Sequence, residues 1–334
     1  MTLLVAVLLF VISQDDIAAQ AQQLAVDRQY DKAILLWRKA LAQNPRHFAS
    51  LFNLGLTFFN QQRPVEAIEV LRRAAAVSPG DFNTHYLLGA AHSQLRQSDE
   101  AIRCWRAAAA LQPTNGKMLQ LLVVEYAKGR YFVEAAAAAD KALAWNPEDA
   151  NAYFLAIKAS QDAGDLDRGA QIAALAVAKF PNLSRANFEH AFYLQKRGEI
   201  DQAMTFLQKA IDLDPKYEEP AFFMGDMLLK QGRDEDAIRY LRAAIGNRND
   251  YVPARNLLAR AWMNLEKWPE AVAELESTVR IDPRHPQPHL LLSQIYFRLG
   301  DEDRAKKERN LSLQLRRDNP TILEAVQGRP YDKP

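Results

Sequence analysis

Histidine is the residue whose spacing in this sequence comes closest to a chemical site. His85 and His92 lie seven residues apart, and His285 and His289 enclose two prolines. Imidazole groups hold Zn²⁺ when two histidines lie one helical turn apart with a further ligand beside them. Neither pair has a neighbouring carboxylate at the spacing that would complete such a group, so we predict no metal site and interpret His92 as a packed histidine.

The single cysteine gives equally little support for catalysis. One cysteine, Cys104, excludes an intramolecular disulfide and a multi-cysteine zinc site. No histidine is spaced to activate its thiol, so we interpret it as a structural residue. A glycine-rich phosphate loop is also absent from the sequence. We therefore predict no catalytic residues, no cofactor and no metal, and we expect that the chain is not an enzyme.

The balance of charge limits the class of partner. The chain contains 42 Lys and Arg residues and 41 Asp and Glu residues, for a formal net charge of +1. Proteins that bind nucleic acid usually carry a broad positive potential. A nucleic-acid partner is therefore not predicted.

A spacing of 34 residues organises the chain from Gln14 to Asn319, and three columns of the repeat carry it. The twentieth column is small throughout: Ala33, Ala67, Ala101, Ala135, Gly169, Ala203, Ala237, Ala271 and Ala305. The twenty-seventh is also small: Ala40, Ala74, Ala108, Ala142, Ala176, Ala210, Ala244, Thr278 and Ser312. The thirty-second is proline except at Asn249 and Arg317. Small residues allow helices to cross closely, and proline ends a helix, so each unit is predicted to be a helical hairpin.

Turn and cap residues agree with this frame. Asp81, Asn115 and Asp149 are suitable N-caps for the first helix of their units. Five glycines fall where the first helix of a hairpin must end, a place that often needs a positive φ: Gly129, Gly164, Gly198, Gly232 and Gly300. Local signals and the period therefore indicate the same hairpins.

The period and its skeleton resemble the tetratricopeptide repeat. Matching segments include Leu54-Gly55 with Phe58, Leu88-Gly89 and Met224-Gly225. The resemblance implies an all-α, right-handed α-solenoid of about nine helix-turn-helix units. These lie at residues 14–47, 48–81, 82–115, 116–149, 150–183, 184–217, 218–251, 252–285 and 286–319. Val123 and Ile157 replace the usual small eighth residue, Ala139 and Ala173 replace the usual large twenty-fourth, and we expect these two units to pack differently.

Residues 1–13 resemble a leader. Residues 3–12 are apolar, which is shorter than the roughly 20 residues needed to span a bilayer, so we predict no integral membrane span in the mature chain. Val11 and Ser13 are small enough to precede a cut that leaves Gln14 first. No basic residue precedes the apolar run, and an apolar segment packed on the first hairpin is the alternative. We expect export to the periplasm or the medium if the leader is genuine, and a cytoplasmic protein otherwise.

The C-terminal end of the array has polar character. Arg309 occupies a position that is apolar in other units, which is typical of a terminal repeat that presents one face to water. Residues 320–334 are predicted to form a short capping helix followed by a polar tail.

Binding residues are predicted on the first helices, which in this family line the concave face. Aromatic or apolar side chains form the predicted peptide groove: Phe52, Leu56, Phe59, Tyr86, Phe154, Phe188, Phe192 and Phe222. A cationic edge accompanies them: Lys196, Lys230, Arg260 and Arg298. The alternative is that the rings pack on adjacent helices and the charges solvate the helix face. The carboxylate clamp by which some family members hold chaperone tails is not matched, because Phe52 and Leu56 occupy its positions.

These observations predict a non-catalytic scaffold that binds an extended or helical peptide segment of another protein in an aromatic-lined groove. Two alternatives remain. One is an assembly or self-association subunit of an envelope complex. The other is a non-catalytic presenting subunit of an enzyme.

Overall fold

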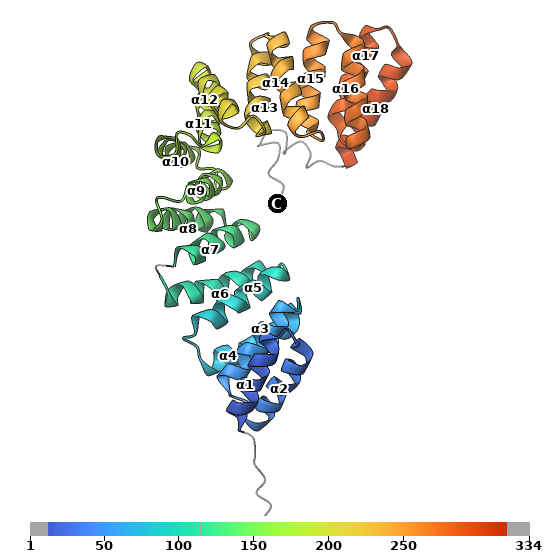
Figure 1. Cartoon of the computed structure of the whole chain (residues 1–334). Coiled ribbons are helices and arrows are strands. Elements are labelled where there is room, and N and C mark those ends of the chain that lie inside the picture. Colours follow the sequence, from blue (N-terminus) through green and yellow to red (C-terminus); the bar gives the residue numbers. More distant parts are fainter. Residues whose placement is uncertain (1–12, 114, 319–334) are drawn as a thin grey trace, which may run out of the picture. The chain divides into compact units, whose positions relative to one another are not determined.

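The computed structural model describes residues 13–113 and 115–318, and all regular structure in these residues is helical (Figure 1). The helices are α1 (Gln14–Val26), α2 (Tyr30–Gln43), α3 (Phe48–Asn60), α4 (Pro64–Val77), α5 (Phe82–Gln94), α6 (Ser98–Leu111), α7 (Gly116–Lys128), α8 (Phe132–Trp145), α9 (Ala150–Asp162), α10 (Leu166–Lys179), α11 (Ser184–Lys196), α12 (Ile200–Leu213), α13 (Glu218–Lys230), α14 (Asp234–Asn247), α15 (Val252–Asn264), α16 (Trp268–Ile281), α17 (Pro286–Arg298) and α18 (Glu302–Asp318). The predicted all-α solenoid of helix-turn-helix repeats is confirmed. The first helix of every hairpin begins at the residue where the 34-residue frame begins a unit.

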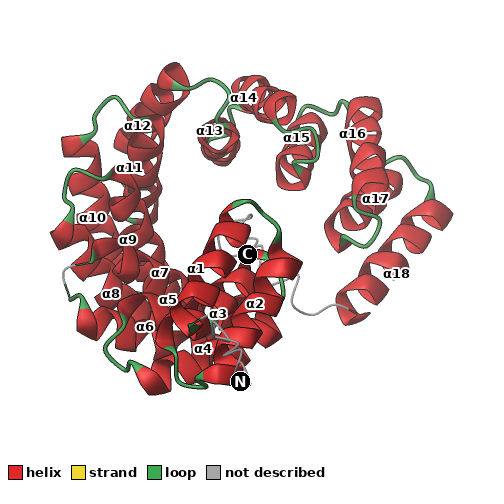
Figure 2. Cartoon of the chain, turned by 60° about the horizontal axis from the view of Figure 1, so that its bottom comes forward, coloured by secondary structure: helices red, strands yellow, loops and turns green. Residues whose placement is uncertain are grey.

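The chain divides into two compact units, unit 1 (Met1–Gly169) and unit 2 (Ala170–Pro334). In unit 1, each second helix packs on its own first helix and on the next one, as α2 does on α1 and α3. In unit 2, α14 packs in the same way on α13 and α15, and the first helices α13, α15 and α17 also touch in sequence. Within each unit the first helices therefore form one face and the second helices the other (Figure 2).

Close contact inside a hairpin explains the Leu-Gly pairs of the repeat. A Cβ atom built on Gly55 would lie 2.5 Å from Leu71 Cγ, and one built on Gly225 would lie 2.6 Å from Leu241 Cγ. The equivalent positions in the fourth hairpin are Val123 and Ala139, and both are fully buried. The two volumes are exchanged there, so the large side chain comes from the first helix instead of the second. The difference expected for this unit is thus an exchange of volume.

The turn inside each hairpin places its fifteenth residue in the left-handed region of backbone space. Four of these residues are the expected Gly164, Gly198, Gly232 and Gly300, and five have side chains: Arg28, Gln62, Arg96, Arg130 and Glu266. Gly129 follows the last residue of α7, as predicted, but the positive φ expected there lies one residue later. Gly129 has φ −77° and Arg130 has φ 64°, because the turn, and not the amino acid, decides which position is left-handed.

Side-chain caps begin several first helices as predicted. Asp81 accepts a hydrogen bond from Thr84 N at 2.7 Å, and Asn115 accepts one from Met118 N at 3.2 Å. Ser13 caps α1 in a reciprocal arrangement: its Oγ accepts from Asp16 N at 3.1 Å, and its own N donates to Asp16 Oδ2 at 3.3 Å. Residues 1–12 of the predicted leader and all of segment 320–334 lie outside the described residues.

Opposite charges recur 28 residues apart on consecutive second helices. Arg168 Nη2 lies 2.8 Å from Asp140 Oδ1. The pKa of Glu66 is lowered mainly by a hydrogen bond from Arg63, and the charge of Arg38, 28 residues earlier, lowers it further. The same spacing separates Arg72 from Glu100, Arg106 from Glu134, Arg242 from Glu270, and Glu276 from Arg304. At Asp140 and Arg168 an ion pair at this spacing therefore joins two neighbouring hairpins.

Among the described residues, none of the helices combines the length and the apolar character that crossing a membrane requires.

Candidate peptide-binding surfaces

The first-helix face of unit 1 carries the accessible part of the predicted aromatic row. On α3, Phe52, Leu56 and Phe59 are half-buried and pack against the core with one side. The ring of Phe52 stacks on Phe48 with centroids 6.0 Å apart. On α5, Tyr86 is 37% exposed. We call Phe52, Leu56, Phe59 and Tyr86 the apolar strip.

Two exposed side chains of the same face were not predicted. Val26, near the end of α1, and Val124, on α7, are both largely exposed to solvent. Val124 occupies the ninth position of its unit, which is the position of Leu56 in the apolar strip. The ninth position was already predicted to face the groove, so Val124 could have been predicted too. It was omitted because the prediction favoured aromatic residues.

Phe154, also in unit 1, has a different environment. It lies on α9 and is buried. Its neighbours on the same helix, Lys158 and Asp162, form an ion pair at 2.9 Å. Phe154 therefore contributes to packing, and a binding role for it stays a prediction.

Three predicted anchors of unit 2 belong to a buried aromatic cluster. Phe188 is only 2% exposed, and Phe192 and Phe222 are also buried. Phe223 lies against all three, with centroid distances of 5.3 Å to Phe188, 5.9 Å to Phe192 and 5.3 Å to Phe222. The free protein thus offers little of these rings to a partner, and their direct role in binding stays a prediction.

Residues at two other positions of the repeat explain this burial. Phe223 is at the sixth position of its 34-residue repeat (218–251). The same position of the repeat at residues 48–81 is Asn53. Tyr217 and Tyr251, each just before a first helix, add rings beside Phe188 at 5.4 Å and beside Phe222 at 5.1 Å. Aromatic residues at the sixth and last positions were the available signal that the fifth-position rings of unit 2 are covered.

The predicted cationic edge is partly neutralised. Lys230 Nζ lies 2.6 Å from Asp226 Oδ2, and Lys196 Nζ lies 5.5 Å from the centre of the Phe192 ring. Arg260 and Arg298 are exposed and make no ion pair within the part of the chain that the structure describes. The edge therefore retains free positive charge on α15 and α17.

One buried amide of this face lacks a partner. Asn256 lies at the fifth position of α15, the position of Phe222 on α13, and is almost fully buried. Its Oδ1 atom has no hydrogen-bond partner among residues 13–113 and 115–318. A buried acceptor without a donor lowers the stability of the folded chain.

A buried carboxylate ties α5, α6 and α7 together and was not predicted. Glu125 is 1% exposed and accepts hydrogen bonds from Ser93 Oγ and Ser98 Oγ, both at 2.8 Å. Lys128 Nζ completes the group at 2.9 Å from Glu125 Oε2. The tenth position is apolar in most other units, so a glutamate there was a signal of a built polar contact.

The residues first considered for chemistry have structural contacts. His92 is buried, as interpreted from the sequence, with Nδ1 2.7 Å from Gln97 Oε1. His289 is buried beside Glu308, with Nδ1 2.6 Å from its Oε2. Burial raises the pKa of the Cys104 thiol, which disfavours the reactive thiolate. No cluster of three or more metal-ligating side chains occurs in the described ranges.

Family models match three parts of the chain. The model described as anaphase-promoting complex, cyclosome, subunit 3 matches residues 26–108. One tetratricopeptide repeat model matches residues 194–261 and 228–287, and another matches 286–319. No curated protein matches the chain.

Solved structures with the same fold cover much of the chain. The type IV pilus biogenesis factor PilW has a TM-score of 0.54 at 22% identity, covering 64% of this chain and 98% of that one. PilF of Pseudomonas aeruginosa has a TM-score of 0.53 at 17% identity, covering 64% and 95%. The APC/C hetero-tetramer Cut9-Hcn1 has a TM-score of 0.56 at 13% identity, covering 93% and 66%. With helical hairpins in a 34-residue frame, the subunit 3 model matching residues 26–108 and tetratricopeptide repeat models matching residues 194–319, the chain is a tetratricopeptide repeat protein.

Proposed function

We propose that this protein is a non-catalytic scaffold that binds an extended or helical segment of another protein on its first-helix face. The observation that supports this most strongly is the apolar strip of unit 1. Its four side chains are held by a rigid array yet keep accessible surface, and two of them are aromatic rings stacked on a neighbour. Large rings with restrained rotamers supply binding area at a low entropic cost.

Polar groups of unit 2 support the same proposal. Arg260 and Arg298 are exposed on first helices and have free charge. A peptide offers side-chain carboxylates to these two guanidinium groups. Charged groups at a binding face mainly set the register and the rate of association, whereas the apolar contacts supply most of the affinity.

The test uses a photo-crosslinking amino acid placed on the apolar strip. The full chain carrying p-benzoylphenylalanine at Tyr86 is expected to crosslink one contiguous segment of one partner in the native cell, identified by mass spectrometry. The matched control places the same group at Val65, which is exposed on α4, on the second-helix face. The same partner segment recovered equally from both positions would show that the first-helix face is not the binding face.

Substitution then measures the contribution of the strip. Phe59→Ser with Tyr86→Ser is expected to weaken the identified complex by about 2 kcal/mol or more, the usual effect of losing an aromatic anchor. Because both residues are partly exposed, helical content should be retained. Unchanged affinity in a folded double variant would contradict the proposal.

A second candidate function is an assembly or self-association subunit. Phe297 is 70% exposed near the end of α17, and Leu299 and Leu313 are also exposed in the last hairpin. Exposed apolar side chains gather at contact surfaces, and Phe297 and Leu299 are only two residues apart in the chain. Light scattering of the full chain is expected to show a defined oligomer that Phe297→Ser dissociates. A monomer at all concentrations would reject self-association.

A further inference from the structure

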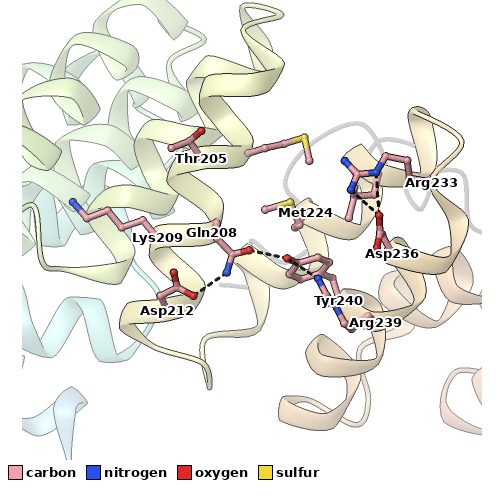
Figure 3. Close-up of a pocket in the computed structure, with 11 residues that line it drawn as sticks. Thr205, Gln208, Lys209, Asp212, Met224, Arg233, Asp236, Arg239 and Tyr240 are labelled. Atoms are coloured by element: carbon pink, nitrogen blue, oxygen red, sulfur yellow. Dashed lines mark hydrogen bonds and ion pairs between the residues drawn. The ribbon is translucent and has the colours of Figure 1, made fainter.

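A groove opens on the second-helix face of unit 2, between α12 and α14, with α13 as its floor (Figure 3). Its volume is about 480 Å³, and it is open to solvent. A volume of this size is enough for a few amino-acid side chains of a bound peptide. An open trough between two helices suits a peptide segment better than an enclosed small molecule.

Hydrogen bonds and an ion pair hold the walls of the groove. Tyr240 on α14 donates its hydroxyl proton to Gln208 Oε1 on α12 at 2.7 Å, and Gln208 Nε2 donates to Asp212 Oδ1 at 2.8 Å. At the N-terminal end of α14, the two Arg233 nitrogens donate to Asp236 Oδ2 at 3.0 and 2.6 Å. The walls are therefore preorganised before any partner binds.

Apolar groups form the lining between these polar contacts. Met224 and Leu228 are buried in the floor, and Met204 on α12 is half-buried. Methionine side chains are flexible and polarisable, so they adapt to apolar groups of different shape. This part of the groove suits one aliphatic or aromatic side chain of a partner.

The groove offers one exposed guanidinium to an anionic partner. Asp236 is paired with Arg233, whereas Asp212 accepts a hydrogen bond from the neutral Gln208 amide and keeps its negative charge. Arg239 is exposed, and its guanidinium lies over the Tyr240 ring at 4.9 Å and donates to the phenol oxygen at 3.3 Å, which is a neutral acceptor. Spare positive charge therefore remains at Arg239. The amine of Lys209 extends away from the groove (Figure 3).

We propose that this groove is a second docking surface, for a peptide segment that carries a carboxylate beside an apolar side chain. The apolar side chain packs on Met204 and Met224, and the carboxylate binds Arg239. This surface is separate from the first-helix face, so the proposal does not depend on the function proposed above.

The test uses the full chain labelled with ¹³C-methyl methionine and the peptide acetyl-Glu-Leu-Glu-Leu-Glu-amide. Saturable shifts of the Met204 and Met224 methyl signals are expected, whereas Met263, which lies on first helix α15, reports binding at the other face. Two comparison peptides replace all Glu by Lys, or both Leu by Ser, and neither is expected to produce these shifts.

Variants distinguish the two parts of the groove. Arg239→Gln is expected to weaken binding about threefold, the usual scale for an exposed ion pair. Lys209→Gln removes one positive charge from α12, but from an amine that extends away from the groove, and it is expected to leave affinity unchanged. Circular dichroism establishes that both variants fold. Shifts confined to Met263, no shifts, equal shifts with the Lys or Ser peptide, or equal weakening by both variants would each overturn the proposal.

Discussion

The exchange of volume between the two helices of a hairpin makes a quantitative prediction. In the second hairpin, Gly55 leaves room for the fully buried Leu71, whereas the equivalent Val123 and Ala139 have the opposite sizes. If one contact decides this packing, Gly55→Val and Leu71→Ala together should restore what each alone disrupts.

The magnitudes follow from the burial of this pair. Leu71→Ala is expected to cost about 2–5 kcal/mol, since the side chain is 0% exposed and leaves a cavity. Gly55→Val places a Cβ 2.5 Å from Leu71 Cγ, and overpacking of this kind costs about 1–3 kcal/mol, offset by a few tenths from the better helix propensity of valine. Additive effects would therefore total about 3–8 kcal/mol. We expect the double variant to lose only about 1–2 kcal/mol.

The assay must resolve one hairpin, because long repeat arrays do not unfold in a single step. Hydrogen exchange of α3 and α4 amides, followed by mass spectrometry, measures the local free energy of opening in the two single variants and the double variant. Leu71→Ala with Gly55→Ala is the matched control, because alanine fills little of the cavity. Additivity of the Gly55→Val and Leu71→Ala costs would refute the interpretation that hairpins exchange volume at this contact.

Three further predictions concern turns, charge and pH. Gly198→Ala, at φ 79°, is expected to lower the free energy of unfolding by about 1 kcal/mol, whereas Arg96→Gly, at φ 57°, should be neutral or stabilising. Thermal melts of the two variants test this. A shift of both melting temperatures in the same direction would contradict a cost of side chains at positive φ. Asp140→Arg or Arg168→Asp should each lower the free energy of unfolding by about 0.2–1 kcal/mol, because both side chains are partly exposed. The double variant with both charges reversed should recover this loss at low salt. Chemical denaturation of the three variants measures these values, and equal stability of the single and double variants would show that the ion pair does not contribute. Burial lowers the pKa of His190, so its neutral form stabilises the fold above the unfolded pKa of about 6.5, and this contribution is lost as pH falls through the lowered folded value. His190→Gln should therefore reduce the loss of stability as the pH falls below about 6.5. An unchanged dependence of the melting temperature on pH would contradict this.

The fold was predictable because its signals are local and repeated. Alanine at the twentieth and twenty-seventh positions marks helix crossings, and the caps Asp81, Asn115 and Asp149 mark where first helices begin. Every repeat has the same pattern, so the end of the second helix before Asn249 could be predicted although the usual proline is missing there. The positive φ expected at Gly129 lies one residue later because glycine is allowed in the left-handed region without being required there.

The candidate site was predictable in its face but not in its depth. A position in the repeat tells which way a side chain leaves its helix, which placed Phe52 and Phe188 on the same face. Whether a ring stays accessible depends on the size of neighbours from other helices. Phe223 covers Phe188, whereas Phe52 keeps a free side. The buried contact of Glu125 was missed for the same reason, because its partners lie on two other helices.

The cap on α1 connects the predicted leader to the timing of folding. A peptidase acts on an extended chain, yet Ser13 and Asp16 hold each other's backbone N–H in the folded hairpin. If residues 1–13 are a leader that is cut after Ser13, the cut therefore has to precede the folding of this turn. The new amino group at Gln14 would then lie at the positive end of the helix dipole, costing about 0.3–1 kcal/mol in addition to about 1 kcal/mol for the lost cap. A chain that starts at Gln14 would thus have a less stable first turn of α1 than a chain that keeps Ser13.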